Sequence, residues 1–388
     1  MKRSNLMIVQ GGGPTAVLNT SLSGVISEAQ RQPDIARIYG ARFGVKGLVH
    51  PELTDLTALM PAQLMRLRET PGAALGTSRY CPGEGDLKKL AGTLRDYDIG
   101  YLLFLGGNGT MRGAEVVSTF CKSEGLSIRV AGVPKTVDND IGLTDRCPGY
   151  GSAARYIASV TRELGADLRS LPQPVTILET MGRSVGWIAA AASLARSEEG
   201  DAPHLVYIPE LPFELDSFLS DLDRTVTKLG WAVVVVAEGI RNSDGSLVYE
   251  TNDSSQSDPL KRPMTGGVAQ HLASIVGQRL RIRCRSEKPG LLGRVSMAHV
   301  SAQDVEDAAL VGQAGVQGLV SGSSDTMVAL NPLQESALGP VRLVPLAEAG
   351  VDRPIPPRFL QAGEIPLSDS FLEYVRPLVG KLTEFQRL

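Results

Sequence analysis

Two aspartates and a lysine share one short segment, Pro134–Asp140, and their types suit acid–base chemistry. If this segment is extended, Asp138 and Asp140 face the same side, because alternate residues of an extended chain do so. Their mutual repulsion calls for a cation nearby, either Lys135 or a metal ion. One carboxylate can then take a proton from a hydroxyl while the other helps to hold Mg²⁺, as phosphoryl transfer requires. The alternative is a turn whose aspartates form only local hydrogen bonds.

Glycine-rich turns follow two of the predicted strands. The segment Gln10–Pro14 contains three consecutive glycines, and Gly106–Thr110 reads GGNGT. Each turn precedes a predicted helix, whose exposed amide groups and dipole would attract an anion such as phosphate. The chain has no P-loop motif, and Gly113 falls one position too late for a Rossmann fingerprint. A tight turn without a ligand is the alternative interpretation.

A second group of candidates lies further along the chain. Arg183 falls near the first turn of a predicted helix, where a cation opposes the helix dipole, so it is a candidate phosphate ligand. Glu238 ends an apolar strand and is followed by glycine, which suits a carboxylate that binds sugar hydroxyls. Arg294 and His299 lie in the predicted loop Gly293–Asp304. For Arg183 and Glu238 a solvated surface charge is the alternative, whereas a lone histidine such as His299 is more often structural than a ligand.

These residues need a scaffold that brings the ends of several strands together. Short apolar runs bounded by glycine or proline alternate with amphipathic segments, which is typical of a parallel sheet covered by helices on both faces. We therefore predict an α/β fold of two doubly wound domains with mainly parallel sheets. The polar loops should meet at the carboxyl ends of the strands, where such sheets bind ligands.

The predicted elements fall into two series. The first comprises strands over Leu6–Val9, Tyr101–Leu105 and Ile128–Val133, a helix from about Ala16 to Arg31 and another that runs to Cys121. The second comprises strands over Val175–Glu179, Leu205–Ile208 and Ala232–Val236 and helices over Trp187–Arg196 and Leu215–Lys228. We predict a larger domain over residues 1–170, a smaller one over 171–330 and a C-terminal segment, 331–388, that packs back on the body. Asn252–Pro263 is predicted to be a surface loop, and Asn331–Pro357 to be irregular or short-stranded.

Composition excludes several classes of protein. The 388 residues include 39 basic and 42 acidic side chains, and a net charge of −3 argues against nucleic acid as a partner. The four cysteines are scattered, so neither a disulfide framework nor a zinc motif is predicted, and a reducing, cytoplasmic compartment fits best. The longest apolar stretch, Trp231–Ala237, is seven residues, against the ~20 needed to cross a bilayer. We therefore expect neither a membrane anchor nor a secretory signal.

Several motifs occur in a fixed order along roughly residues 5–330: GGGPTAVLN, GTSR at Gly76–Arg79, GGNGT, PKTVDND, PGYGSA at Pro148–Ala153, MGRSVGW and AEG. Each motif is short, but together they are specific. In this order they resemble the phosphofructokinase family, and more closely its pyrophosphate-related branch. The resemblance implies a phosphotransferase that uses Mg²⁺ and forms a homodimer or homotetramer.

The resemblance also assigns roles to residues. Asp138 would take the proton from the sugar 1-hydroxyl, with Lys135 and Arg183 assisting the transfer, and Asn108 and Asp140 would lie at the metal. The phosphoryl donor would be held in the first domain by Gly12, Arg79, Gly107, Asn108, Gly109 and Thr110. The sugar phosphate would be held by Thr136, Asp138, Met181, Gly182, Arg183, Glu238 and, across a subunit interface, Arg294.

Several positions depart from the family pattern. Asn108 stands where ATP-using members commonly carry a metal-associated aspartate, which should weaken the attraction for Mg²⁺. Pro174 replaces an arginine that often grips the sugar 6-phosphate from a neighbouring subunit, and Ser184 replaces a frequent histidine. Gly293 likewise replaces the glutamine expected before Arg294.

Two positions point to different donors. Gly109 replaces an aspartate that crowds the nucleotide α-phosphate in pyrophosphate-using relatives, so it leaves room for ATP. Lys135 resembles the lysine with which those relatives compensate charge on the leaving phosphate. We predict transfer from ATP to O1 of fructose 6-phosphate as slightly favoured, with pyrophosphate as the alternative donor. A different phosphosugar, such as sedoheptulose 7-phosphate, is the alternative acceptor, and a catalytically silent sensor is a third hypothesis suggested by Asn108.

Overall fold

The protein divides into two compact units, each described here by itself. The structure, a computed structural model, describes residues 3–80, 82–170, 174–250, 266–334 and 339–386. Unit 1 comprises Met1–Tyr150 and Asp304–Arg353, and unit 2 comprises Gly151–Gln303 and Pro354–Leu388. The α/β architecture with mainly parallel sheets confirms the predicted fold class. The loop predicted over Asn252–Pro263 lies outside the described residues.

The observed division differs from the predicted boundaries after residues 170 and 330. The chain leaves unit 1 at Tyr150, returns at Asp304 and leaves it again at Arg353, so both units are discontinuous in sequence. Composition and periodicity identify elements, but they do not reveal to which sheet a later element returns.

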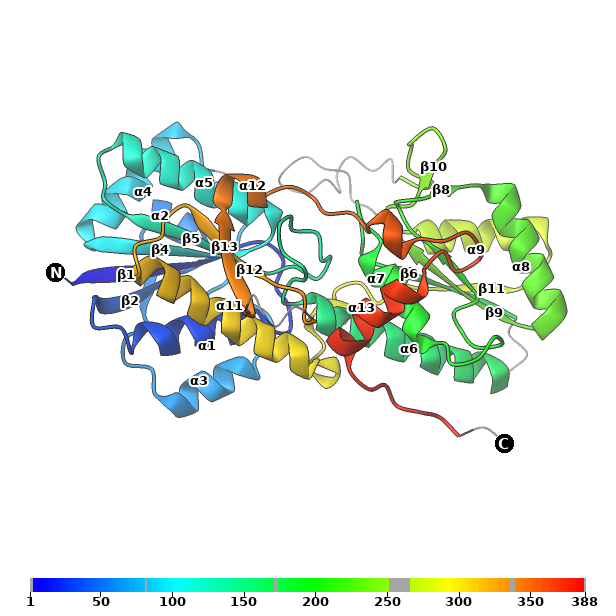
Figure 1. Cartoon of the computed structure of the whole chain (residues 1–388). Coiled ribbons are helices and arrows are strands. Elements are labelled where there is room, and N and C mark those ends of the chain that lie inside the picture. The colour runs from blue at the N-terminus through cyan, green and yellow to red at the C-terminus, as the bar shows by residue number, and fades with distance from the viewer. Residues whose placement is uncertain (1–2, 81, 171–173, 251–265, 335–338, 387–388) are drawn as a thin grey trace. The chain divides into compact units, whose positions relative to one another are not determined.

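Unit 1 is built on a seven-stranded sheet with strand order β13-β12-β5-β4-β1-β2-β3 (Figure 1). Its strands are β1 (Ser4–Gln10), β2 (Ile35–Ala41), β3 (Leu53–Asp55), β4 (Ile99–Gly106), β5 (Arg129–Pro134), β12 (Thr326–Leu330) and β13 (Val341–Pro345). Its helices are α1 (Leu18–Ala29), α2 (Lys46–Val49), α3 (Pro61–Arg68), α4 (Glu84–Asp96), α5 (Asn108–Ser123), α11 (Ala302–Val320) and α12 (Leu346–Ala349). The edge strands β3 and β13 are antiparallel to their neighbours, and the other pairs are parallel.

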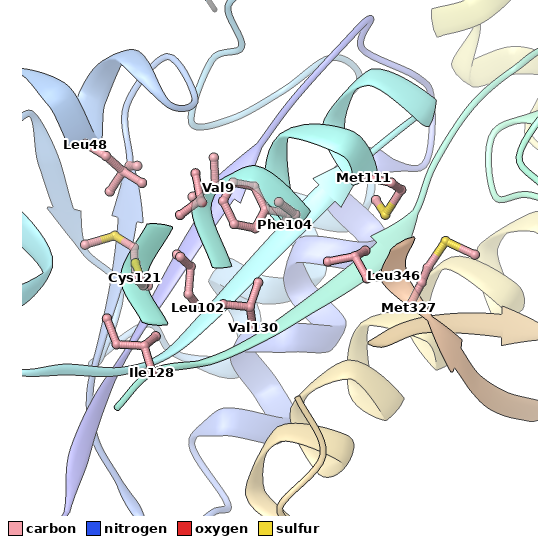
Figure 2. Close-up of a cluster of buried hydrophobic side chains, with 14 of the residues drawn as sticks. Val9, Leu48, Leu102, Phe104, Met111, Cys121, Ile128, Val130, Met327 and Leu346 are labelled. Atoms are coloured by element: carbon pink, nitrogen blue, oxygen red, sulfur yellow. The ribbon is translucent and has the colours of Figure 1, made fainter. Parts of the chain in front are cut away.

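Helices cover both faces of the sheet in unit 1. Successive residues of a strand point to opposite sides, so each strand contributes side chains to both faces. Leu102 and Phe104 of β4 pack on the face covered by α4, α5 and α12, as Figure 2 shows for Phe104, Met111 and Leu346. Leu103 and Leu105 pack on the face covered by α1, α3 and α11 (Figure 1). Each fully buried side chain of this size contributes about 1.5–3 kcal/mol. Residues of β1 and β5 are divided between the same two faces.

Unit 2 contains a four-stranded parallel sheet with order β11-β6-β9-β7. Its strands are β6 (Val175–Thr180), β7 (Leu205–Tyr207), β9 (Ala232–Ala237) and β11 (Cys284–Glu287), and a separate pair is formed by β8 (Pro212–Phe213) and β10 (Arg241–Asn242). Its helices are α6 (Tyr150–Ser170), α7 (Trp187–Ala191), α8 (Leu215–Leu229), α9 (Val268–Arg279), α10 (Leu292–Val295) and α13 (Asp369–Val379). The helix predicted over Trp187–Arg196 is shorter than expected, since Ala192–Ala195 forms a 3₁₀ turn. Within the described residues, no helix is long and apolar enough to cross a bilayer.

Candidate active site

The turn between β4 and α5 has the geometry of an anion site. Gly107 caps α5 in an extended conformation, and its carbonyl oxygen accepts a hydrogen bond from the Thr110 amide at 2.8 Å. The amides of Asn108 and Gly109, the first two residues of this sixteen-residue helix, cannot bond within the helix, and together with its dipole they favour a negative charge. A Cβ at Gly109 would meet nothing within 4 Å in this structure.

Three strand ends meet at Gly12, in the turn after β1. Gly12 has φ +73°, and a Cβ there would lie 3.4 Å from Lys135 Nζ, 3.9 Å from Thr110 Oγ1 and 4.0 Å from the Gly107 amide nitrogen. The turns after β1 and β4 and the segment after β5 therefore converge, as the sequence predicts. Lys135, only 2% exposed, donates from Nζ to the Gly13 carbonyl at 2.6 Å. The result is a cradle of an amide, a hydroxyl and an ammonium around one point.

The loop that carries Asp138 leaves β5 beside this cradle. The Lys135 amide donates to the Gly106 carbonyl at 3.0 Å, and the Asp138 amide donates to Thr136 Oγ1 at 3.1 Å. Asn139, between the two aspartates, has φ +54° and accepts a hydrogen bond at Oδ1 from the Cys147 amide. The segment is therefore not extended, so the predicted alternation of Asp138 and Asp140 does not apply. Asparagine suits this left-handed position better than most residues.

Asp140 lies in a cluster of oxygen atoms around Asn108. Asn108 Nδ2 donates to the Asp140 carbonyl at 2.9 Å and to Asp140 Oδ2 at 3.1 Å. The same nitrogen donates to Asp352 Oδ1 at 2.8 Å. Burial raises the pKa of Asp140, a hydrogen bond from Thr136 opposes this, and the Asp352 carboxylate raises it further. Asn108 and Asp140 are the predicted metal residues, whereas Asp352, more than two hundred residues further along the chain, is not predicted by any motif.

The cluster has the donor chemistry that Mg²⁺ prefers. Asn108 is 7% exposed, and its Oδ1 is buried without a hydrogen-bond partner, as is Asp140 Oδ1. An unpaired buried oxygen is unfavourable unless a ligand satisfies it. The described residues contain no group of three or more His, Cys, Asp or Glu placed to hold a metal. Mg²⁺ commonly needs only one or two carboxylates, because substrate phosphates and water complete its shell, so Asn108 and Asp140 fit it.

Buried polar contacts hold the loop after Asp140 in place. Arg146 forms two hydrogen bonds with the Asp307 carboxylate of α11, at 2.6 and 2.7 Å, and these side chains are 4% and 6% exposed. Asp304, also on α11, accepts a hydrogen bond from the Gly149 amide at 2.8 Å. Removing one partner of such a buried pair typically costs about 3–5 kcal/mol, because the other charge is left unpaired. Helix α11 therefore fixes a loop that is distant in sequence.

Arg79 is exposed and lies on a segment that passes close to the end of β1. Gly44 lies between this segment and the end of β1. A Cβ on Gly44 would be 2.9 Å from the Gln10 carbonyl oxygen and 3.4 Å from Ser78 Oγ. The structure thus places the GTSR segment at the predicted edge of the sheet. Donor binding by Arg79 stays a prediction.

In unit 2, the loops after β6 and β9 meet as their parallel pairing requires. The Glu238 amide donates to the Thr180 carbonyl at 3.0 Å, and the Gly239 amide donates to the Gly182 carbonyl at 3.1 Å. Gly182 has φ +136°, and a Cβ at Gly239 would lie 1.9 Å from the Arg183 carbonyl oxygen. Arg183 and Glu238 are both partly exposed. The structure therefore brings together Met181, Gly182, Arg183 and Glu238, the predicted sugar-phosphate residues of this unit.

A buried glutamate that the sequence did not single out supports these loops. Glu210 Oε1 accepts hydrogen bonds from the amides of Gly186 and Ile355, both at 3.0 Å. Burial raises the pKa of Glu210, while these amides oppose the rise. Its sequence context, Ile208–Pro212, carries no motif that would have identified it.

The remaining candidates of unit 2 lie on other elements. Arg294 is on the short helix α10, and its neighbour Gly293 packs against the ring of Tyr156 on α6. His299 bonds to Ser296 at 2.8 Å and packs edge-on against Tyr156, which favours the structural role predicted for it. The role of Arg294 across a subunit interface stays a prediction.

Comparisons with known proteins agree with this arrangement. The phosphofructokinase family model matches residues 5–319. A pyrophosphate–fructose 6-phosphate 1-phosphotransferase from Xanthomonas campestris is 34% identical over 98% of this chain and 92% of its own length. A crystal structure of a pyrophosphate-dependent phosphofructokinase from Marinobacter aquaeolei has a TM-score of 0.86 and 33% identity, covering 99% of this chain and 94% of that one. A sulfofructose kinase from Alkalicoccus urumqiensis is 33% identical over 84% of this chain and 82% of its length.

The family model covers most of the chain, and the similarity to the first two relatives extends over nearly all of it. The same residues that form the cradle at Gly12 and the loop at Asp138 carry the motifs from which the resemblance was predicted. The chain therefore belongs to the phosphofructokinase family.

Proposed function

We propose that this protein transfers a phosphoryl group from pyrophosphate to O1 of fructose 6-phosphate, giving fructose 1,6-bisphosphate. The observation that carries the proposal is the convergence of Lys135 Nζ, Thr110 Oγ1 and the Gly107 amide on the space above Gly12. Phosphoryl transfer depends chiefly on positioning and on neutralising charge, and this cradle supplies both. The loop bearing Asp138 begins beside the same turn, which supports Asp138 as the base.

Pyrophosphate replaces the slight preference for ATP that the sequence suggested. The relatives from Xanthomonas and Marinobacter, which match nearly the whole chain, are both named for pyrophosphate, so they support the alternative donor better. The open space at Gly109 admits either donor and therefore does not select ATP. The buried Lys135 ammonium at the Gly13 carbonyl is well placed to compensate charge on a leaving phosphate.

In this mechanism, Asp138 takes the proton from the 1-hydroxyl as O1 attacks the nearer phosphorus of pyrophosphate. The bridging P–O bond breaks, and orthophosphate leaves. The amides at the start of α5 and the Lys135 ammonium stabilise the charge on the transferring and leaving groups. Thr136 in unit 1 and Met181, Gly182, Arg183 and Glu238 in unit 2 are proposed to bind the sugar phosphate.

We propose that Mg²⁺ is held by Asn108 and Asp140. When bound, the ion would neutralise part of the negative charge of pyrophosphate and orient it. The unpaired oxygens of Asn108 and Asp140 support this assignment.

A second acceptor deserves testing because the sugar site departs from the family pattern. Pro174 replaces an arginine that often grips the 6-phosphate, and Ser184 replaces a frequent histidine, which leaves fewer basic side chains for a dianion. The relative from Alkalicoccus is named sulfofructose kinase, and a sulfonate carries one negative charge where a phosphate carries nearly two at neutral pH. A sugar with a sulfonate at C6, or the earlier alternative sedoheptulose 7-phosphate, is therefore the second candidate.

One matrix of assays tests donor and acceptor together. Purified protein is supplied with pyrophosphate or ATP and with fructose 6-phosphate, 6-deoxy-6-sulfofructose or sedoheptulose 7-phosphate, and kcat/KM is compared for each pair. We expect the highest value for pyrophosphate with fructose 6-phosphate. Turnover with ATP alone would restore the first donor prediction. Thermal stabilisation by ligands without turnover for any pair would support the silent sensor.

Assembly into a homodimer or homotetramer is also proposed, because Arg294 is expected to reach a sugar phosphate across a subunit interface. Analytical ultracentrifugation of the purified chain checks this, and a monomer at assay concentration would contradict it.

A further inference from the structure

We propose that Asp352 is a magnesium ligand of this chain and supplies the carboxylate that Asn108 lacks. The inference rests on the proposed phosphotransferase function and adds a residue to its metal site. Asp352 lies beyond residue 319, where the match to the family model ends. Its assignment therefore comes from the fold of unit 1 and not from the motifs.

The contacts of Asn108 indicate a cation position. Its Nδ2 lies 2.8 Å from Asp352 Oδ1 and 3.1 Å from Asp140 Oδ2, so one amide group bridges two carboxylates. Two carboxylates this close repel each other unless positive charge lies between them. In this structure the partly positive amide nitrogen supplies that positive charge.

The oxygen of the same amide provides the second observation. Asn108 is 7% exposed. Its Oδ1 atom is buried and has no hydrogen-bond partner. Nitrogen and oxygen share one planar group, so a half-turn of the amide exchanges them and directs Oδ1 toward the two carboxylates. Asn108, Asp140 and Asp352 would then offer three oxygen ligands, the type of ligand that Mg²⁺ requires.

The position of Asp352 is fixed by the backbone on both sides of it. Asp352 forms an antiparallel bridge with Ile141, and the Gly142 amide donates to the Val351 carbonyl at 2.9 Å. The Arg353 amide donates to the Asp140 carbonyl at 2.8 Å. The residues flanking Asp352 are therefore tied to the residues flanking Asp140, and the two carboxylates are held together by the main chain.

The exposure of Asp352 also fits a magnesium ligand. Asp352 is exposed, whereas Asn108 is buried, so the cluster has one face open to solvent. Mg²⁺ sheds its water reluctantly and usually keeps several water molecules in its shell. An open face leaves room for that water and for donor phosphates.

Binding of Mn²⁺, a spectroscopic substitute for Mg²⁺, tests the proposal without turnover. Free Mn²⁺ is measured by electron paramagnetic resonance in titrations of the full chain without sugar or pyrophosphate. The variants are Asp352→Asn and Asp352→Glu. The control is Glu348→Gln, which removes the same charge from an exposed residue of the same segment. Thermal unfolding without metal checks that each variant is folded.

We expect Asp352→Asn to weaken Mn²⁺ binding about tenfold or more, since even indirect partners of metal ligands contribute that much. Asp352→Glu should retain part of the affinity, Glu348→Gln should bind like wild type, and Asn108→Asp should bind more tightly. Wild-type affinity in Asp352→Asn, or an equal loss in Glu348→Gln, would overturn the proposal. So would failure of the wild-type chain to bind Mn²⁺. Because no substrate is present, these results are independent of whether the donor and acceptor are correctly assigned.

Discussion

Asp138 and Asp140 lie two residues apart but have different surroundings. Asp140 belongs to the cluster with Asn108 and Asp352, and burial there raises its pKa. Its carboxylate oxygens are of the type that binds a cation. Asp138 follows Thr136, whose hydroxyl oxygen accepts a hydrogen bond from the Asp138 amide. These surroundings support the proposed roles, with Asp140 at the cation and Asp138 as the base that removes the proton.

Replacing Asp138 by asparagine tests this division of roles. We expect kcat to fall by about 10²–10⁴, the usual contribution of a general base, because an amide cannot accept the proton. Sugar-phosphate binding, measured by calorimetry, should change little. Asp96→Asn, an exposed aspartate of α4, is the matched control. A kcat within a few-fold of wild type would show that another group is the base.

Lys135→Met tests the role of the buried ammonium in the cradle. Methionine keeps most of the length of the side chain but removes the charge that lies near Gly12 and bonds to Gly13. We expect kcat with pyrophosphate to fall by about 10²–10³, as when one group that stabilises developing charge is removed. Steady-state kinetics measure the effect. The control is Lys46→Met, which changes an exposed lysine of α2. If kcat falls less than tenfold, Lys135 does not stabilise charge on the leaving phosphate.

At the scale of single residues, the sequence predicts the site wherever chemistry and local spacing coincide. Gly12, Lys135 and Asp138 lie in motifs at strand ends, and the structure brings their loops together. Asp352 and Glu210 act through contacts between segments that are far apart in the chain, so spacing carries no information about them. The left-handed Asn139 was also missed, because local backbone geometry overrides the assumed extended chain.

At the scale of elements, strands with continuous apolar runs were predictable. The predicted strands Leu6–Val9, Tyr101–Leu105 and Ala232–Val236 lie within β1, β4 and β9, because both faces of these strands are buried. Strand β2 alternates polar and apolar residues less clearly and was not identified, and β13 was predicted only as part of the irregular or short-stranded segment Asn331–Pro357. Their places depend on the sheet that they join, which short-range periodicity does not encode.

The contact between the loops after β6 and β9 provides a test at this scale. Gly239→Ala would place a Cβ 1.9 Å from the Arg183 carbonyl oxygen. This oxygen belongs to the main chain, so it cannot rotate out of the way as a side chain could. Overpacking of this kind typically costs about 1–3 kcal/mol and should displace Arg183. We expect KM for fructose 6-phosphate to rise more than KM for the donor.

Gly200→Ala is the control for this variant, because a Cβ at Gly200, also in unit 2, would meet nothing within 4 Å. Its kinetic constants should match those of wild type. Equal increases of both KM values in Gly239→Ala would indicate a general disturbance and contradict a specific role of these loops in sugar binding.

At the scale of the whole molecule, each unit has its own buried core, and unit 2 contains a buried ionisable group remote from the proposed chemistry. His204 is 3% exposed, and its Nδ1 accepts a hydrogen bond from the Val233 amide at 3.0 Å. The ring also packs edge-on against Trp231, with ring centroids 4.5 Å apart. Burial, followed by the positive charge of Arg196, lowers the pKa of His204 to about 4.

This pKa makes the stability of unit 2 depend on pH. The unfolded chain binds a proton to His204 near pH 6.5, whereas the folded chain resists it until about pH 4, so acid favours unfolding between these values. We expect wild type to lose up to about 3 kcal/mol of stability through this group as the pH falls across that interval. His204→Asn keeps an acceptor for the Val233 amide but cannot be protonated. Urea unfolding of both proteins should therefore show the stability of wild type, relative to the variant, declining below pH 6.5. A difference that stays constant down to pH 4 would mean that His204 is protonated in the folded chain as readily as in the unfolded one.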